Sequence, residues 1–152
     1  MKCLPLIGRI LFAAIFIMSA PNHFNPETIK YADDHGVPWA SVSVPLAGLV
    51  ALAGGLSILL GFRGRFGALL LVLFLVPVTP MMHDFWSVVD PSAAEIQQLL
   101  FMKNIAMLGG ALFIAYFGTG PFSLDNHVLH YHLAGHQPPA PKPPEAPAAA
   151  HS

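Results

Sequence analysis

The sequence has few charged residues. Asp, Glu, Lys and Arg make up 10% of its 152 residues, whereas soluble domains average about 25%. Hydrophobic residues make up 55%, and a soluble domain of this length has too little interior to bury so much apolar surface. This composition excludes a water-soluble globule and indicates a membrane protein.

The chain also has no excess of basic residues. Seven Lys and Arg against eight Asp and Glu give a formal net charge of −1. Proteins that bind nucleic acids neutralise phosphates with clustered Lys and Arg. DNA and RNA are therefore not expected partners.

Cysteine is nearly absent, because Cys3 is the single one. One cysteine excludes an internal disulfide and the dithiol through which a thiol oxidase stores electrons. The sequence also contains no Gly-rich phosphate loop, no nucleophile elbow, no paired carboxylates and no C-x-x-C-H haem motif. A chain without these groups is not expected to catalyse a redox reaction alone, although whether it is an enzyme stays open.

Four long apolar runs are the main feature that is present. They cover about residues 4–20, 40–62, 66–82 and 99–124, and each approaches the roughly 20 residues that a helix needs to cross a bilayer. The runs lack the alternation of barrel strands, so helices are expected. A cleaved signal peptide is the alternative for the first run, but Arg9, Met18 and Pro21 disfavour it. The predicted fold is an all-α membrane protein, a four-transmembrane-helix up-down bundle.

The connections between the runs contain recognisable turn and cap signals. Residues 61–65 form a short polar turn that makes the second and third spans antiparallel neighbours. Residues 25–32 predict a short surface helix, with Asn25 as cap and Pro26 in first position, and residues 90–95 repeat that pattern before the fourth span. The bundle is expected to occupy residues 1–125. It is followed by a His-rich juxtamembrane segment, 126–136, and a disordered Pro/Ala-rich tail, 137–152.

The distribution of Lys and Arg predicts the orientation in the membrane. If the amino terminus is cytoplasmic, five of these residues lie inside and two outside. The inner residues are Lys2, Arg9, Arg63, Arg65 and Lys142, and the outer ones are Lys30 and Lys103. The positive-inside rule therefore places both termini in the cytoplasm.

Small residues in the second and fourth spans indicate helix packing. Helices in lipid approach one another where side chains are small. The positions expected at such contacts are Ala47, Ala51, Gly54, Gly55, Ala106 and Gly110. Proline residues at 45, 77 and 80 are expected to bend the second and third spans.

Polar side chains gather at the predicted outer ends of spans one, three and four. Ionisable groups near hydrocarbon are costly, and this makes them candidates for function. The candidate outer pocket contains His23, His83, Asp84, Trp86, Lys103 and Asn104, with Trp39 also at its rim. Lys103 is expected to pair with Asp84. A membrane-rim salt bridge without a pocket is the alternative explanation.

Two further polar groups have simpler interpretations. Arg9, Arg63 and Arg65 form the inner polar group, and Arg9 is expected to extend to lipid phosphates. The His-rich segment contains weak metal-ligand candidates, namely His127, His130, His132 and His136. Their spacing matches no closed metal motif, so no metal site is predicted.

Five short motifs in order resemble the DoxX family of small bacterial four-helix membrane proteins. They are 8–11 (GRIL), 54–61 (GGLSILLG), 83–86 (HDFW), 103–106 (KNIA) and 120–125 (GPFSLD). Similar proteins often carry a Glu three residues before the Gly-Gly pair, where this chain has Ala51. Proton or quinone chemistry assigned to that Glu therefore does not transfer.

The resemblance implies a multi-pass protein of the bacterial cytoplasmic membrane. It also implies an accessory or quinone-associated subunit of a redox or oxidative-stress complex, with quinone as the candidate cofactor. Candidate partners are membrane lipids, oxidoreductase proteins and further copies of the chain. The alternatives are a small carrier or a bundle that binds lipid or another hydrophobic compound, and a membrane scaffold or assembly protein.

Overall fold

The computed structural model describes residues 3–125, which fold into helices without any strand in that range. The elements are α1 (Leu4–Ser19), the 3-10 helix η1 (Ala20–Phe24), α2 (Pro26–Asp34), α3 (Ala40–Leu60), α4 (Gly64–Met82) and α5 (Pro91–Phe117). Four stretches are long and apolar enough to cross a membrane: Leu4–Phe24, Ala40–Leu60, Gly64–Met82 and Pro91–Phe117. The predicted all-α architecture with four spans is confirmed. The predicted His-rich segment and Pro/Ala-rich tail lie outside the described residues.

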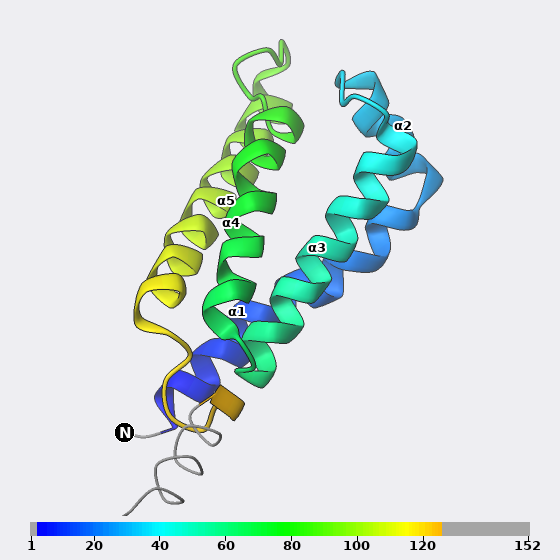
Figure 1. Cartoon of the computed structure of the whole chain (residues 1–152). Helices are drawn as coiled ribbons and strands as arrows, with labels where there is room; N and C mark the ends of the chain where they lie inside the picture. Colours follow the sequence, from blue (N-terminus) through cyan, green and yellow to red (C-terminus); the bar gives the residue numbers. More distant parts are fainter. Residues whose placement is uncertain (1–2, 126–152) are drawn as a thin grey trace, which may run out of the picture.

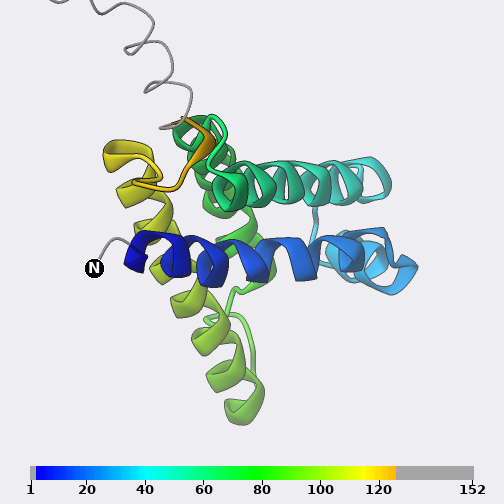
Figure 2. The ribbon, with the colours of Figure 1, turned by 90° about the horizontal axis from the view of Figure 1, so that it is seen from below.

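The long helices pack in chain order, α1 on α3, α3 on α4 and α4 on α5. Figure 1 shows the amino terminus, the α3–α4 turn and the segment after α5 at one end of the molecule, and α2 and the α4–α5 loop at the other. We call these the N-terminal end and the α2 end. The pair α1 and α3 diverges from the pair α4 and α5 toward the α2 end (Figures 1 and 2). The two ends therefore differ in how closely the helices approach.

Cap residues place most helix ends close to the predicted positions. Asn25 caps α2 by accepting a 2.9 Å hydrogen bond from the Glu27 N–H, which confirms the predicted surface helix. Gly61 ends α3 with φ +65°, and it donates to Ile58 while Phe62 donates to Ser57. This pair of hydrogen bonds is a Schellman motif, in which glycine adopts the left-handed conformation without steric cost.

The fourth span differs from its predicted bounds of about 99–124. It begins earlier because Asp90 caps Ala93 N–H and the helix continues from this cap without a break. It ends at Phe117 because Gly118 and Gly120 have φ of +82° and +73° and Pro121 follows. Residues 118–124, predicted as membrane-spanning helix, instead fold back over the N-terminal end (Figure 1).

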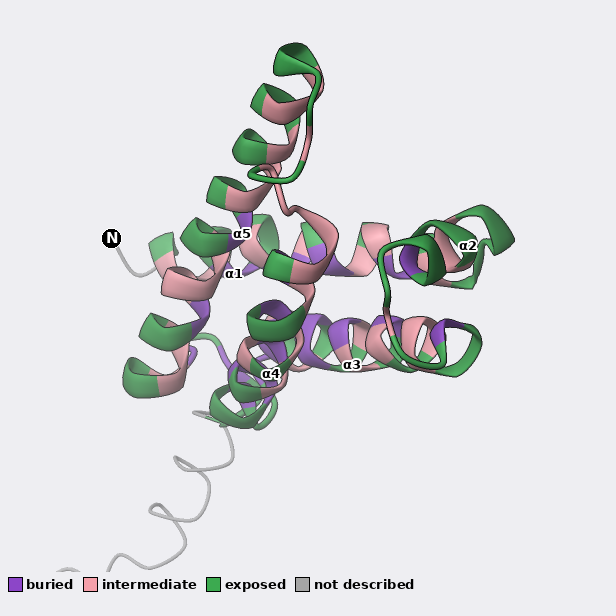
Figure 3. Cartoon of the chain, turned by 90° about the horizontal axis from the view of Figure 1, so that it is seen from above, coloured by how far each residue is buried: buried purple, intermediate pink, exposed green. Residues whose placement is uncertain are grey.

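The core is narrow and rich in small side chains. It consists of Ala13, Phe16, Ala51, Ile58, Ala68, Leu71, Leu75 and Ala111. The outward faces of the long helices are exposed (Figure 3), and they carry many large apolar residues, such as Leu11, Leu73 and Phe113. Such a surface is unfavourable in water and favourable against lipid tails.

Glycines account for the closest helix contacts. A Cβ on Gly54 would lie 2.9 Å from the Gly67 carbonyl oxygen, and one on Gly55 would lie 3.2 Å from Phe16 Cβ. Gly110 receives the ring of Phe12 from α1. Ala106, expected at such a contact, is exposed instead, and Ala111 is buried on the inner face of α5. The face of α5 that meets the bundle is therefore rotated away from Ala106.

Candidate functional site at the α2 end

A cavity of about 530 Å³ lies at the α2 end, where the two helix pairs diverge. Residues of α1, η1, α3, α4 and α5 line it, together with Thr28 of α2. Most of the lining is apolar, and His23, His83, Lys103 and Asn104 supply polar groups. Cavities of this size are typical of sites for small molecules. The sequence predicted a pocket formed by spans one, three and four; the structure adds α3 and α2 to its walls.

Gly48 allows η1 to lie close to α3 beside the cavity. A Cβ at Gly48 would lie 2.5 Å from His23 Cβ and 3.4 Å from the Ala20 carbonyl oxygen. Any larger residue would push η1, and His23 with it, away from α3. The sequence places Gly48 beside the predicted packing stripe of the second span, and the structure shows that its partner there is η1.

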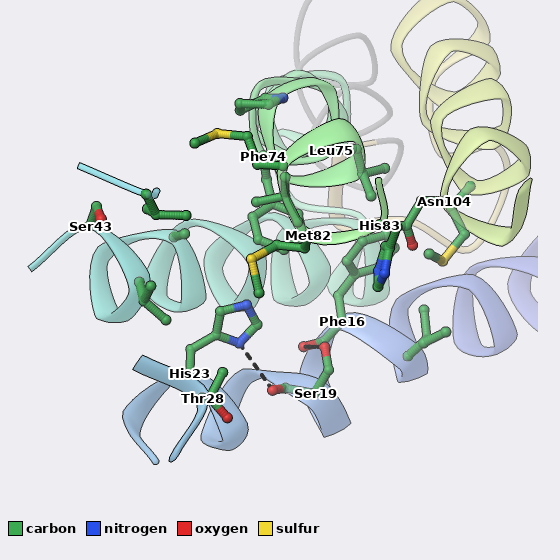
Figure 4. A pocket seen from close by; sticks show the side chains of 18 of the residues that line it. Phe16, Ser19, His23, Thr28, Ser43, Phe74, Leu75, Met82, His83 and Asn104 are labelled. Atoms are coloured by element: carbon green, nitrogen blue, oxygen red, sulfur yellow. Dashed lines mark hydrogen bonds between the residues drawn. The ribbon is translucent and has the colours of Figure 1, made fainter. Parts of the chain in front are cut away.

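His23 enters the cavity from η1 (Figure 4). Its Nδ1 lies 3.2 Å from the Ser19 carbonyl oxygen, which only accepts hydrogen bonds, so Nδ1 carries the proton. The ring also packs edge-on against Phe74, with centroids 5.7 Å apart. In the neutral ring, Nε2 is left as the nitrogen that accepts a hydrogen bond.

His83 is held by a chain of hydrogen bonds that reaches α2. Its Nδ1 donates to Gln97 Oε1 at 2.8 Å, and Gln97 Nε2 donates to the Tyr31 hydroxyl at 3.2 Å. The chain connects the end of α4, the first turns of α5 and the surface helix. Sequence reasoning missed Gln97. The available signal was its spacing, because Gln97, Asn104 and Ala111 recur every seven residues and share one face of α5.

Asn104 is the most buried polar side chain of the cavity wall. Its residue is 6% exposed, it lines the cavity, and within residues 3–125 its amide has no hydrogen-bond partner. Its amide atoms are not among the fully enclosed side-chain atoms that lack a partner in residues 3–125, so the amide is open to the cavity and can bond a molecule there. The neighbouring Lys103 also lines the cavity and is more exposed. The wall beside Asn104 therefore offers N–H donors to a molecule in the cavity.

The expected ion pair between Lys103 and Asp84 is not formed in the described part of the chain. The Asp84 carboxylate instead accepts a hydrogen bond from the Ser87 hydroxyl within its own turn. Trp86 packs against Phe85 and Phe101, with ring centroids 5.1 and 5.9 Å away. Asp84 and Trp86 are absent from the cavity lining, as is Trp39, which is 86% exposed. The structure therefore brings together His23, His83, Lys103 and Asn104, and leaves the other candidates outside.

Arg9 also differs from its expected position. Its side chain is 4% exposed and does not extend to the membrane surface, because residues 118–125 cover it. Arg9 Nη2 donates to the Phe122 carbonyl oxygen at 2.9 Å, whereas Nε and Nη1 are buried without a partner among the described residues. The arginine is therefore part of the closed N-terminal end.

Comparisons with known proteins agree with these features. A sequence model of the DoxX family matches residues 4–84, just over half of the chain. The chain is also 33% identical over 122 residues to Inner membrane protein YqjF of Escherichia coli (strain K12), covering 79% of this chain and 88% of that protein. The chain belongs to the DoxX family. It is thus an integral membrane protein of that family.

Two further relatives extend the comparison of this DoxX protein. Inner membrane protein YphA of Escherichia coli (strain K12) is 27% identical over 79% of this chain and 86% of its own length. Surfeit locus protein 4 homolog of Schizosaccharomyces pombe (strain 972 / ATCC 24843) is 26% identical over 83% of this chain, which spans only 38% of that protein. No solved structure matches the chain.

The DoxX match ends shortly after α4, at residue 84. It therefore includes His23 and His83 of the cavity wall but neither Lys103 nor Asn104. Ala51, where similar proteins often carry a Glu, is fully buried in the core between the helices. A carboxylate at this place would be deep in the bundle, and this chain has no such group there.

Proposed function

We propose that this DoxX protein is a binding subunit of the inner membrane that holds a quinone-type molecule in the cavity at the α2 end. In this role it is an accessory to a redox complex whose partners supply the electron-transfer centres. The observation that carries the proposal is the partnerless amide of Asn104 in the wall of a largely apolar cavity. A ligand carbonyl at this position satisfies the amide without introducing a charge.

The chemistry of the lining fits a quinone. Apolar side chains such as Phe16, Leu75 and Met107 suit a ring and an isoprenoid tail. The N–H groups of Asn104 and Lys103 suit a carbonyl oxygen, and among the described residues that line the cavity there is no carboxylate to repel it. A bound quinone supplies reversible electron storage; the residues of this chain bind it, orient its carbonyl groups and exclude water.

The test is to measure, by titration calorimetry, the binding of a short-tailed ubiquinone to the purified protein in detergent. Asn104→Leu should weaken binding about tenfold, because a hydrogen bond of roughly 1.4 kcal/mol is lost. Gln98→Leu is the matched control, since it removes an amide from an exposed position on α5 and should leave affinity unchanged. Equal affinities for wild type and Asn104→Leu, or no binding at all, would contradict the proposal.

The accessory role requires a separate experiment. Purification of the tagged protein in mild detergent should recover an oxidoreductase, and Asn104→Leu should retain this partner while lowering quinone-dependent respiration. Recovery of the protein alone, with respiration unchanged after deletion of the chain, would contradict the role in a redox complex.

A further inference from the structure

A second hollow lies at the N-terminal end, opposite the cavity with Asn104. It has a volume of about 630 Å³ and is formed by the start of α4, the end of α5 and the segment that follows α5. Its lining includes Arg63, Arg65, Phe66, Phe117 and Ser123. The proposed quinone site uses none of these residues, so any function of the hollow is independent of it.

The charge of this end is strongly positive. Arg9, Arg63 and Arg65 contribute three guanidinium groups, and Asp125 is the one carboxylate among the described residues that line the hollow. Both oxygens of Asp125 accept backbone hydrogen bonds, from Arg63 N–H at 2.8 Å and Gly64 N–H at 3.1 Å. Across residues 3–125 no ion pair links Asp125 to an arginine. Counting only these four residues of the described range, two positive charges therefore remain in excess.

Arg9 adds a buried part of this charge. The guanidinium and Ser123, which lines the hollow, both lie on the same side of Gly61, against the position that a Cβ on this glycine would take. Its Nε and Nη1 lack partners within the described range. A buried cation without a counter-ion is costly, and an anion held nearby lowers this cost.

Exposed aromatic residues at the hollow favour a lipid over a soluble anion as the molecule that binds there. Phe66 and Phe117 line the hollow and are 59% and 67% exposed. Both stand at the ends of membrane-spanning helices, beside the arginines. The hollow therefore combines cationic groups, which suit a phosphate, with apolar walls, which suit the start of an acyl chain.

We propose that this hollow binds the phosphate of an anionic phospholipid from the leaflet on the side of the amino terminus. Arg63 and Arg65 bind the phosphate, Arg9 contributes its positive charge from beside Ser123, and Phe66 and Phe117 contact the acyl chains. The bound lipid attaches the N-terminal end of the bundle to this leaflet. At this end, residues 118–125 close over α1 and the α3–α4 turn.

The test is native mass spectrometry of the full chain, released from detergent containing phosphatidylglycerol or phosphatidylcholine in equal amounts. Wild type should retain phosphatidylglycerol preferentially. Removing each arginine should weaken retention about fivefold, so Arg65→Gln alone should show about fivefold loss and Arg63→Gln with Arg65→Gln about 25-fold. Lys30→Gln on α2 removes an equal charge from the opposite end and should have no effect.

Three outcomes would overturn the proposal. Equal retention of both lipids would indicate unspecific contact, and so would equal loss in Lys30→Gln and Arg65→Gln. In a further arm with inorganic phosphate, stabilisation of wild type by phosphate without retention of phosphatidylglycerol would assign the hollow to a soluble anion. The single variant Arg65→Gln should fold normally, because the Arg65 backbone takes no part in the hydrogen bonds to Asp125. Its melting temperature without lipid should therefore equal that of wild type.

Discussion

Asp125 supplies hydrogen-bond acceptors to the start of α4 from a position 61 residues further along the chain. The residue before α4, Arg63, has φ +47° and provides no side-chain cap of its own. The carboxylate of Asp125 therefore satisfies N–H groups that a local Ser, Thr or Asp satisfies in most helices, and its negative charge suits the helix N-terminus. Asp125 and the hydrogen bond from Arg9 to Phe122 together hold the segment after α5 on the N-terminal end.

Replacing Asp125 with Ala should destabilise the protein by about 1–2 kcal/mol, the usual range for loss of a helix cap. The measurement is the melting temperature in detergent. Asp33→Ala is the control, because Asp33 is exposed and its carboxylate has no partner within residues 3–125. An equal melting temperature for Asp125→Ala and wild type would show that the cap is unimportant.

Asp90 makes the stability of the first turn of α5 depend on pH. Hydrogen bonds from the Ser92 hydroxyl and the Ala93 N–H hold the pKa of Asp90 below its ordinary value. Because the folded pKa is depressed, the stabilisation is complete above the ordinary pKa of about 3.9 and is lost as pH falls through the lower folded value. The first turn of α5 should therefore open in acid.

Hydrogen exchange of the amides in residues 91–95 tests this expectation. Relative to Asp90→Asn, which still caps but does not titrate, wild type should lose protection as pH falls below the ordinary pKa of about 3.9 and through the lower folded value. Comparison at each pH cancels the intrinsic change in exchange rate. Parallel behaviour of the two proteins would mean that Asp90 ionisation does not support the helix.

At the level of elements, the contact between α3 and α4 depends on paired glycines. A Cβ on Gly54 would lie 2.9 Å from the Gly67 carbonyl oxygen and one on Gly67 would lie 3.0 Å from the Gly54 carbonyl oxygen, so the two backbones approach closely. In lipid, where burial of apolar surface gives no advantage between helices, such close approach is a main source of association.

Gly54→Ala should lower stability by about 1–3 kcal/mol, since its Cβ would meet Gly67 backbone. Gly109→Ala is the matched control, because a Cβ there meets nothing within 4 Å. In a helix the alanine at 109 should even be neutral or slightly stabilising. Thermal unfolding of both variants in the same detergent decides the matter, and equal losses would contradict the packing role.

At the level of the whole molecule, the two ends differ in chemistry. The α2 end has the cavity, whose lining includes a single lysine, Lys103, and the N-terminal end has Arg9, Arg63 and Arg65. Because the positive-inside rule counts Lys and Arg, we propose that the N-terminal end faces the cytoplasm.

Cysteine labelling in intact cells tests this orientation. In a Cys3→Ser background, Asp33→Cys should react with an impermeant maleimide from outside, whereas Arg65→Cys should react only after the membrane is opened. Both positions are exposed in the structure, so a lack of labelling reports sidedness and not burial. The reverse pattern would invert the proposed topology.

The properties that follow from neighbouring residues were predictable from the sequence. The four spans, the caps Asn25 and Asp90, and the turn after Gly61 depend on local hydrophobicity and on hydrogen bonds within a few residues. The difference between the predicted and the observed end of the fourth span also has a local basis, since Gly118 and Gly120 are turn signals inside an apolar run. Apolar length alone favoured a span up to residue 124.

The site residues depended on packing, and sequence reasoning placed them only in part. The sequence located polar groups at one membrane depth, which brought His23, His83, Lys103 and Asn104 into one prediction. It did not determine the rotation of each helix, and that rotation directs Asn104 inward and leaves Ala106 exposed. Asp84 bonds to Ser87 and not to Lys103, Gln97 bonds to His83, and Asp125 caps α4. These pairings were decided only when the helices packed, because side chains distant in sequence compete for partners by their positions in space.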